Sequence, residues 1–222
     1  MNTKESISKN YIFKENTMGE LTFEGKFEQY YQECDDPWNQ SGQGNMLQYY
    51  SRSRKTIAKH LNNYQIRKTI EVGCGLGYAC NELSKQTQTE IEGIDISTEA
   101  ISQAIKKFPN FDFFVGDITN INFKTNVVSY QCVLLNQLLW YILEDLQLSI
   151  NNSISMLETN GLLIISNAFA REQRYGKNII DGFDGAFKYF NNCSPKLKLI
   201  HAEFNDSNNR VIDGIFVLKK IA

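Results

Sequence analysis

Hydrophobic residues recur at three- and four-residue steps over residues 45–62, which predicts an amphipathic helix. Downstream of this helix, short apolar runs alternate with amphipathic stretches. The apolar runs predict five strands, over residues 69–72, 90–96, 111–115, 130–135 and 162–166. The stretches between them predict helices over residues 78–85, 98–108 and 138–158, the last of which is broken near Leu143.

The two ends of the chain follow other patterns. Residues 1–20 are rich in Asn, Lys, Ser and Glu and are expected to be flexible. Residues 23–32 mix aromatic and charged side chains in a way that suits a short helix, and residues 35–44 are rich in turn formers. Near the C-terminus, the runs 196–204 and 211–219 flank a turn-rich segment, which predicts an antiparallel hairpin.

The alternation of strands and helices predicts an open α/β sheet with helices on both faces. We expect a flexible N-terminus (1–20), an N-terminal helical segment that acts as a lid (21–62) and one α/β domain (63–222). Ligands of such sheets bind beyond the carboxyl ends of the strands. The residues at those ends are therefore the candidates for function.

The charge balance argues against a nucleic-acid partner. The 222 residues contain 23 Lys and Arg against 25 Asp and Glu, which gives a net charge of −2 and a pI near 5.8. A protein that tracks a long phosphate backbone needs a basic surface, and this composition does not provide one.

The sequence also predicts neither a membrane span nor a metal site. Its most hydrophobic stretch, residues 133–143, is interrupted by Asn136 and Gln137 and is too short to cross a bilayer. The five cysteines are odd in number and lack zinc-binding spacing, so we expect reduced thiols in a cytoplasmic protein. His60 is expected to be a surface or capping residue and His201 to lie in a strand, and neither is placed like a metal ligand.

Three glycines follow the first predicted strand, in the segment Glu71-Val72-Gly73-Cys74-Gly75-Leu76-Gly77. Glycines let the backbone pass close to a ligand, and the following helix offers free N–H groups at its N-terminus. The spacing differs from the G-x-G-x-x-G fingerprint of dinucleotide-binding proteins, and no Gly-Lys-Ser/Thr follows it, which excludes a P-loop.

Carboxylates stand at the ends of the next two strands. Asp95 ends the second strand and Asp117 follows the third. A carboxylate at the first of these places can accept hydrogen bonds from both hydroxyls of a ribose. Taken singly, each aspartate is equally compatible with a loop residue or a helix cap. In combination with the glycine loop, the two aspartates are strong evidence for a cofactor site.

With these motifs the chain resembles class I S-adenosylmethionine-dependent methyltransferases, over about residues 67–222. The resemblance implies a Rossmann-like seven-stranded sheet of order 3-2-1-4-5-7-6, with S-adenosylmethionine as the cofactor. It implies that Glu71 orients the amino group of the cofactor, that Asp95 holds the ribose and that Asp117 borders the adenine. The residues expected to contact the cofactor are Trp38, Arg54, Glu71, Gly73, Cys74, Gly75, Gly77, Asp95, Ile96, Asp117, Ile118 and Asn136.

A narrower resemblance is to the nodulation-factor N-methyltransferases, which act on the amino group of a chitooligosaccharide. It is carried by Asp36-Pro37-Trp38, by Tyr50-Ser51-Arg52-Ser53-Arg54 and by the run from Leu134 to Ile142. The resemblance suggests a sugar-related acceptor. Trp38 is then a lid over the cofactor or a core residue. Arg54 either reaches a carboxylate of the cofactor or substrate, or lies on a solvated helix face.

An acceptor pocket is expected beside the cofactor. Tyr141 lies where many related enzymes place a histidine, so it is the candidate catalytic residue, with a core aromatic as the alternative. Residues 167–184 follow the fifth strand and either overhang the acceptor or form a solvated loop. The candidate substrate-binding residues are Tyr50, Trp140, Asn167, Arg171, Tyr175 and Asp184.

Together these features predict a cytoplasmic N- or O-methyltransferase, acting as a monomer or a homodimer. Its expected partner is a small polar acceptor, an amine or hydroxyl of a sugar or of a cell-surface polysaccharide building block, and not a nucleic acid or a membrane. The lack of a well-placed histidine favours an amine, which needs only to be unprotonated, whereas a hydroxyl needs its proton removed, for which Tyr141 or Asp184 could serve. The alternative is a binding-only relative that keeps the cofactor pocket and acts as a partner or regulator.

Overall fold

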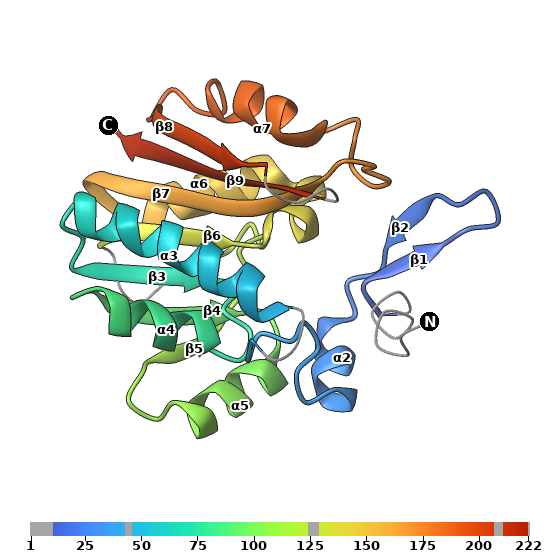
Figure 1. The fold of residues 1–222 in the computed structure, drawn as a ribbon, viewed down its shortest axis with the longest axis horizontal. Coiled ribbons are helices and arrows are strands. Elements are labelled where there is room, and N and C mark those ends of the chain that lie inside the picture. Colours follow the sequence, from blue (N-terminus) through green and yellow to red (C-terminus); the bar gives the residue numbers. More distant parts are fainter. Residues whose placement is uncertain (1–10, 43–45, 124–128, 207–210, 222) are drawn as a thin grey trace.

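A seven-stranded mixed sheet forms the centre of the computed structural model, which describes residues 11–42, 46–123, 129–206 and 211–221 (Figure 1). The strands are β3 (Lys68–Val72), β4 (Glu90–Asp95), β5 (Phe113–Val115), β6 (Tyr130–Asn136), β7 (Leu157–Ala170), β8 (Leu197–Asn205) and β9 (Val211–Lys220). Their order is β5-β4-β3-β6-β7-β9-β8, which reads 3-2-1-4-5-7-6 when they are numbered along the chain. The first five pair in parallel, so their carboxyl ends meet at one edge of the sheet.

Helices cover both faces of this sheet. One face is covered by α3 (Leu47–Asn63), α4 (Tyr78–Gln86) and α5 (Thr98–Lys107), and the other by α6 (Leu146–Met156) and α7 (Gly182–Phe190). Helix α2 (Phe27–Glu33) lies beside the sheet and packs against α5 (Figure 1). In β6, Leu134 belongs to the hydrophobic cluster that includes residues of α3, α4 and α5, whereas Val133 and Leu135 belong to the cluster of α6 and α7. Successive strand residues point to opposite faces, so one apolar strand supplies both cores. Among the described helices, none is long and apolar enough to span a membrane.

The N-terminal segment contains strands where a flexible stretch was expected. β1 (Phe13–Glu15) pairs antiparallel with β2 (Leu21–Phe23), and the rings of Phe13 and Phe23 lie 5.6 Å apart. This ribbon stands to one side of the sheet (Figure 1), and Phe13 contacts the body of the molecule directly through the rings of Tyr141 and Tyr175. The expectation of a flexible stretch up to residue 20 is therefore corrected for this ribbon, while residues 1–10 lie outside the described part.

Three further elements differ from their expected bounds. β7 continues to Ala170 rather than ending at Ser166, because it pairs with β9 along this extension. The helix expected from residue 138 begins as two 3₁₀ turns, Leu139–Tyr141 and Leu143–Asp145, which precede α6. Helix α7 was not expected from the sequence.

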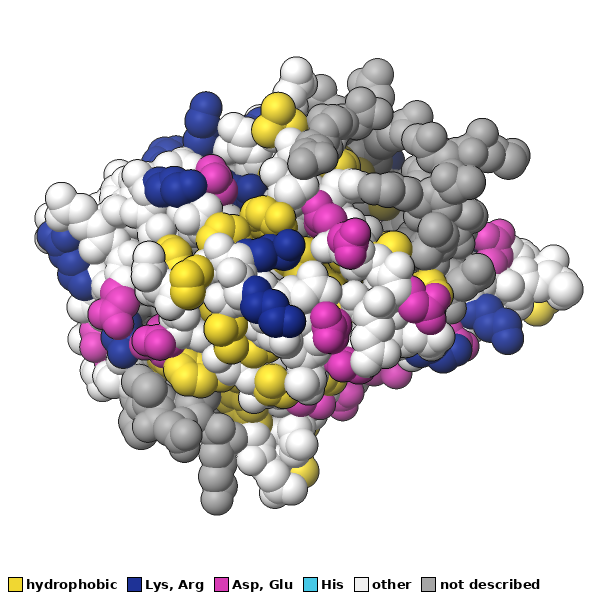
Figure 2. Space-filling view, turned by 90° about the horizontal axis from the view of Figure 1, so that it is seen from below, with side chains coloured by type: hydrophobic (Ala, Val, Ile, Leu, Met, Phe, Trp, Pro, Cys, Tyr) yellow, Lys and Arg dark blue, Asp and Glu magenta, His cyan; other side chains and the backbone are white. Residues whose placement is uncertain are grey.

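The sheet edge formed by β5 carries exposed apolar side chains. Figure 2, which views the molecule from the side of α5, shows hydrophobic side chains among Lys and Arg side chains. Phe114 and Val115 of β5 and Ile105 of α5 are among the exposed large hydrophobic residues. β5 is only three residues long, so this edge leaves few unpaired backbone groups.

The packing of β6 makes a testable prediction about stability. Leu134 is 0% exposed, so Leu134→Ala should lower the free energy of unfolding by about 2–5 kcal/mol through lost burial and the cavity left behind. Ile121→Ala is the control, because Ile121 is 81% exposed and its truncation should cost less than about 0.5 kcal/mol. Urea denaturation measures both, and equal losses in the two variants would contradict the placement of β6 in the core.

Candidate active site

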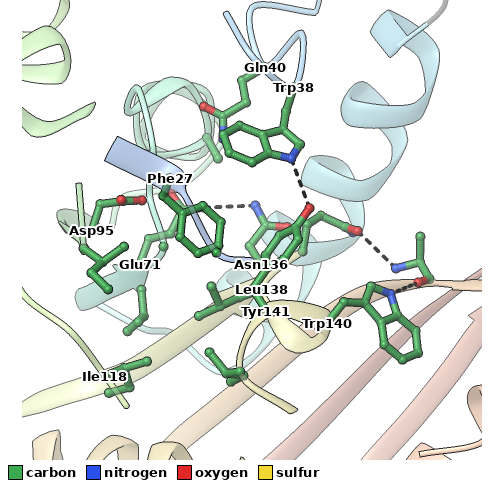
Figure 3. Close-up of a pocket in the computed structure, with 18 of the residues that line it drawn as sticks. Phe27, Trp38, Gln40, Glu71, Asp95, Ile118, Asn136, Leu138, Trp140 and Tyr141 are labelled. Carbon is green, nitrogen blue, oxygen red and sulfur yellow. Dashed lines mark hydrogen bonds between the residues drawn. The ribbon is translucent and has the colours of Figure 1, made fainter. Parts of the chain in front are cut away.

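A cavity of about 1130 Å³ lies at the carboxyl ends of β3, β4, β5 and β6. Residues of these strand ends form its floor, and residues of the N-terminal segment and α3 form the opposite wall (Figure 3). The predicted site residues on its wall are Trp38, Tyr50, Arg54, Glu71, Gly73, Asp95, Ile96, Asp117, Ile118, Asn136, Trp140 and Tyr141.

The three glycines after β3 serve different contacts. All have φ between 54° and 77°, the left-handed region that glycine adopts without strain. Gly73 lines the cavity, and a Cβ on it would lie 2.6 Å from Leu138 Cδ1. A Cβ on Gly75 would lie 2.5 Å from the hydroxyl of Tyr31, and one on Gly77 would lie 2.6 Å from Phe113.

Only the first glycine is therefore on the cavity wall. Gly75 is covered by Tyr31, Gly77 begins α4 against the sheet, and Cys74 is buried in the core. Cys74, Gly75 and Gly77 do not line the cavity, so the direct contact expected between them and a ligand stays a prediction. They shape the loop, because their positions have no room for side chains or face away from the cavity.

Asp95 joins the ends of β3 and β4. Its Oδ2 accepts the N–H of Gly75 at 2.8 Å, and its Oδ1 accepts the N–H of Ser97 at 2.9 Å. The carboxyl group lines the cavity, although the residue is only 7% exposed. Burial raises the pKa of Asp95 to about 6, against the opposing effect of these two N–H groups. Further hydrogen-bond donors from a ligand would stabilise the ionised form.

Glu71 is a buried carboxylate with two side-chain donors. It is 2% exposed, and it accepts hydrogen bonds from Asn136 Nδ2 and from the thiol of Cys80, each at 3.0 Å (Figure 3). Burial raises the pKa of Glu71, although both donors oppose this. The nearby guanidinium of Arg54 also lowers it.

Arg54 brings a buried positive charge to the same cavity. It is 7% exposed, its Nη2 donates to the carbonyl of Gln40 at 2.8 Å, and its guanidinium lies 5.0 Å from the ring centroid of Tyr50. Its Nε is buried and has no hydrogen-bond partner within the described chain. A buried N–H without an acceptor is costly, so this group is suited to a negatively charged ligand atom. With Glu71, the pair suits the carboxylate and ammonium of an amino acid.

The other end of the cavity, beyond Asp95, is more apolar. Ile118 is buried, Ile96 is half exposed, and both line the cavity. Asp117 stands between them, with its Oδ1 accepting the backbone N–H of Thr119 at 2.8 Å. Such a wall suits a flat ring with polar edges.

Aromatic side chains form the wall nearest the N-terminal segment. Trp38 Nε1 donates to the hydroxyl of Tyr141 at 3.0 Å (Figure 3). Phe27 meets the Tyr141 ring edge-on at 5.5 Å, and Phe23 lies 6.4 Å from it. Burial raises the pKa of Tyr141, although the Trp38 hydrogen bond lowers it in part. Tyr141 is therefore protonated near neutral pH.

Several wall residues were missed by the sequence analysis. They are Phe23, Phe27, Gln40, Gln137 and Leu138. Gln137 has a φ of 56°, which is uncommon for a residue with a side chain and often marks a functional site. The high aromatic content was the available signal for the two phenylalanines, but nothing in their spacing placed them here.

Four of the predicted substrate-binding residues lie off the cavity wall. Asn167 is buried within β7 and accepts the N–H of Leu139. Arg171 pairs with Asp206, the Tyr175 ring packs 5.0 Å from Phe13, and Asp184 is exposed on α7. The expected overhang of the acceptor stays a prediction for these residues, of which Tyr175 contacts the cavity wall through the ring of Phe23 at 6.2 Å.

One curated relative is a viral protein. The chain is 25% identical over 164 residues to "Putative methyltransferase 235L" of Invertebrate iridescent virus 6. The matching region covers 69% of this chain and 61% of that protein. The chain therefore spans about three fifths of the length of this relative.

Solved structures share the fold at low identity. The N-methyltransferase NodS from Bradyrhizobium japonicum WM9, in complex with S-adenosyl-L-homocysteine, matches with a TM-score of 0.63 at 16% identity, covering 87% of this chain and 98% of that one. The [4+2]-cyclase SpnF matches with a TM-score of 0.66 at 14% identity, covering 82% and 85%. At these identities the likeness concerns the fold alone.

A family model described as a methyltransferase domain matches residues 66–198, which is more than half of the chain. The match contains the strand ends that carry Glu71, Asp95, Asp117 and Asn136. By this match, the chain belongs to the methyltransferase-domain family.

Proposed function

We propose that this protein is an S-adenosylmethionine-dependent methyltransferase whose cofactor occupies the cavity at the strand ends. The observation that carries the proposal is the order of groups along the cavity. Glu71 on β3, with the charge of Arg54 near it, stands at one end, Asp95 ends the neighbouring strand β4, and Ile118 follows β5, the next strand. This order matches the amino acid, ribose and adenine parts of the cofactor. Membership of the methyltransferase-domain family supports the same ligand.

The amino acid end is held by two buried charges. The unpartnered Nε–H of Arg54 donates to the carboxylate of the cofactor, which removes the cost of leaving that donor unpaired. Glu71, oriented by Asn136, accepts from the ammonium group directly or through the adjacent loop at Gly73. The ribose hydroxyls donate to Asp95, and the adenine lies along Ile96, Asp117 and Ile118.

The bound cofactor supplies a methyl group on a positively charged sulfur, which is already activated for displacement by an acceptor. The protein then contributes mainly position and exclusion of water. Trp38 and Tyr141 stand on the wall opposite the strand ends, so they border the acceptor. With its raised pKa, Tyr141 is a poor base at neutral pH and acts as a hydrogen-bond donor that orients the acceptor.

The acceptor is a small polar molecule, an amine or hydroxyl of a sugar or of a cell-surface polysaccharide building block. Aromatic faces at Phe27, Trp38 and Tyr141 suit a sugar ring or a methylated ammonium. An amine fits this wall better than a hydroxyl, because it needs no proton removed once it is neutral. The fold likeness to the N-methyltransferase NodS points the same way.

The N-terminal segment acts as a lid over the cofactor. Gln40 Oε1 accepts the N–H of Leu76 in the glycine loop at 3.1 Å, and Ser97 donates to Glu28 of α2 at 2.7 Å. These hydrogen bonds anchor the segment to the ends of both strands, and its opening would have to break them together with the packing of Tyr31 against Leu76.

A first prediction separates the two ends of the cofactor site. Arg54→Gln should weaken binding of S-adenosylhomocysteine by about tenfold or more, or about 1.4 kcal/mol, because it removes a charged donor to the carboxylate. The same variant should bind 5′-methylthioadenosine, which has no carboxylate, with nearly unchanged affinity. Asp95→Asn should weaken both ligands alike, because both carry the ribose. Isothermal titration calorimetry measures all four affinities.

Lys55→Gln is the matched control for this prediction. Lys55 is an exposed positive charge on the same helix and does not line the cavity, so its loss should change neither affinity by more than about twofold. An equal loss of both ligands in Arg54→Gln would show that Arg54 supports the fold rather than the carboxylate.

A second prediction concerns Tyr141. Tyr141→Phe keeps the ring and removes the hydroxyl, so turnover should fall about tenfold or more while the affinity for the cofactor is unchanged. Tyr175→Phe is the control, since Tyr175 does not line the cavity. Transfer of a radiolabelled methyl group to amino sugars, nucleotide sugars and phosphorylated amino alcohols identifies the acceptor and measures turnover.

Unchanged turnover in Tyr141→Phe would assign Tyr141 to packing alone. Tight cofactor binding without transfer to any acceptor of the screen would favour the binding-only relative.

A further inference from the structure

Two histidines and a glutamate meet on the sheet at a place that the cavity does not include. His60 lies in the last turn of α3, whereas His201 and Glu203 lie on β8, the edge strand. Positions two apart on a strand share one face. The pairing of β8 with β9 shifts register between Leu199 and His201. The fold thus joins residues up to 143 positions apart.

The side-chain atoms that could bind a metal point toward one another. His60 Nε2 lies 3.0 Å from one carboxylate oxygen of Glu203, and His201 Nε2 lies 3.5 Å from the other. The two imidazole rings lie 4.8 Å apart, and all three potential ligand atoms lie within 4.8 Å of one another. Ligand atoms around a tetrahedral zinc ion lie about 3.3 Å apart, and each histidine lies near that distance from a different oxygen of Glu203.

The three side chains are shielded from solvent to different degrees. His60 is 3% exposed, whereas His201 and Glu203 are partly exposed. His201 Nε2 is shielded from solvent and makes no hydrogen bond to any described residue.

We propose that His60, His201 and Glu203 form a zinc site at the β8 edge of the sheet. Two imidazole nitrogens and a carboxylate oxygen are ligand types that Zn²⁺ takes at about 2.0–2.2 Å, with water in the fourth position. Each imidazole binds through the lone pair of Nε2 and keeps its proton on Nδ1. The ion ties the end of α3 to β8, and so stabilises the fold away from the cavity.

One neighbouring charge competes with the metal. Lys59 Nζ lies 3.6 Å from a carboxylate oxygen of Glu203. The Lys59 side chain is largely exposed, so it can turn to solvent at little cost when the carboxylate binds the ion. The sequence analysis expected His60 to be a surface or capping residue and neither histidine to be a metal ligand. The surface position is wrong for His60, because α3 buries this residue against β8.

Zinc binding to the full chain tests this proposal. Protein freed of metal is titrated with Zn²⁺ alone in competition with a chromophoric chelator, and one equivalent should bind. His201→Asn and Glu203→Gln should each weaken binding by about tenfold or more. Both residues are partly exposed, so these variants should fold, which circular dichroism checks. Lys59→Gln should bind zinc at least as tightly as the unaltered protein.

Cysteine provides the control, because thiolates are the common alternative ligands for zinc. Cys34 is partly exposed while the other four cysteines are buried, so Cys34→Ser should leave binding unchanged. Co²⁺ in place of zinc should give a spectrum without thiolate charge-transfer bands. Unchanged affinity in both ligand variants, or loss of binding in Cys34→Ser, would overturn the site. Neither the zinc titration nor the cobalt spectrum depends on methyl transfer.

Discussion

The carboxylate of Asp95 connects the parts of the molecule on which the cavity depends. By accepting the N–H of Gly75 and the N–H of Ser97, it joins the glycine loop after β3 to the start of α5 after β4. Burying this ionised group costs free energy, and the burial raises the pKa of the Asp95 carboxyl to about 6. Glu71 and Arg54 repeat this arrangement one strand away, with a buried carboxylate and a buried donor without an acceptor. A cofactor with matching groups would relieve the cost of all three.

Much of this architecture could be predicted from the sequence, because local patterns carry it. Apolar runs separated by amphipathic helices predicted the α/β sheet, and the short spacing of glycines and aspartates at strand ends predicted which side chains meet there. The elements of the sheet core kept their expected places within a few residues. β7 did not, since its extension depends on pairing with β9, which local propensity does not report.

The remaining features depend on contacts between distant segments. The ribbon of β1 and β2 is ordered by aromatic contacts with residues such as Tyr141 and Tyr175, far along the chain. The aromatic wall and the His60, His201 and Glu203 group arise in the same way. No spacing in the sequence brings such residues together, so only the fold reveals them. Conversely, the charges of Arg171 and Asp184 suited the expected acceptor pocket, but neither residue lines the cavity. Arg171 pairs with Asp206, and Asp184 is exposed on α7.

The central claim is that the cofactor binds at the strand ends beneath the N-terminal segment. Hydrogen–deuterium exchange of the full chain, with and without saturating S-adenosylhomocysteine, tests it most directly. We expect slower exchange in residues 71–77 and 95–97, and also in residues 27–42 and 46–54, because the ligand shields the strand ends and holds the segment closed. Exchange in β8 should not change. Equal exchange in the N-terminal segment and at the strand ends, with and without ligand, would contradict the account.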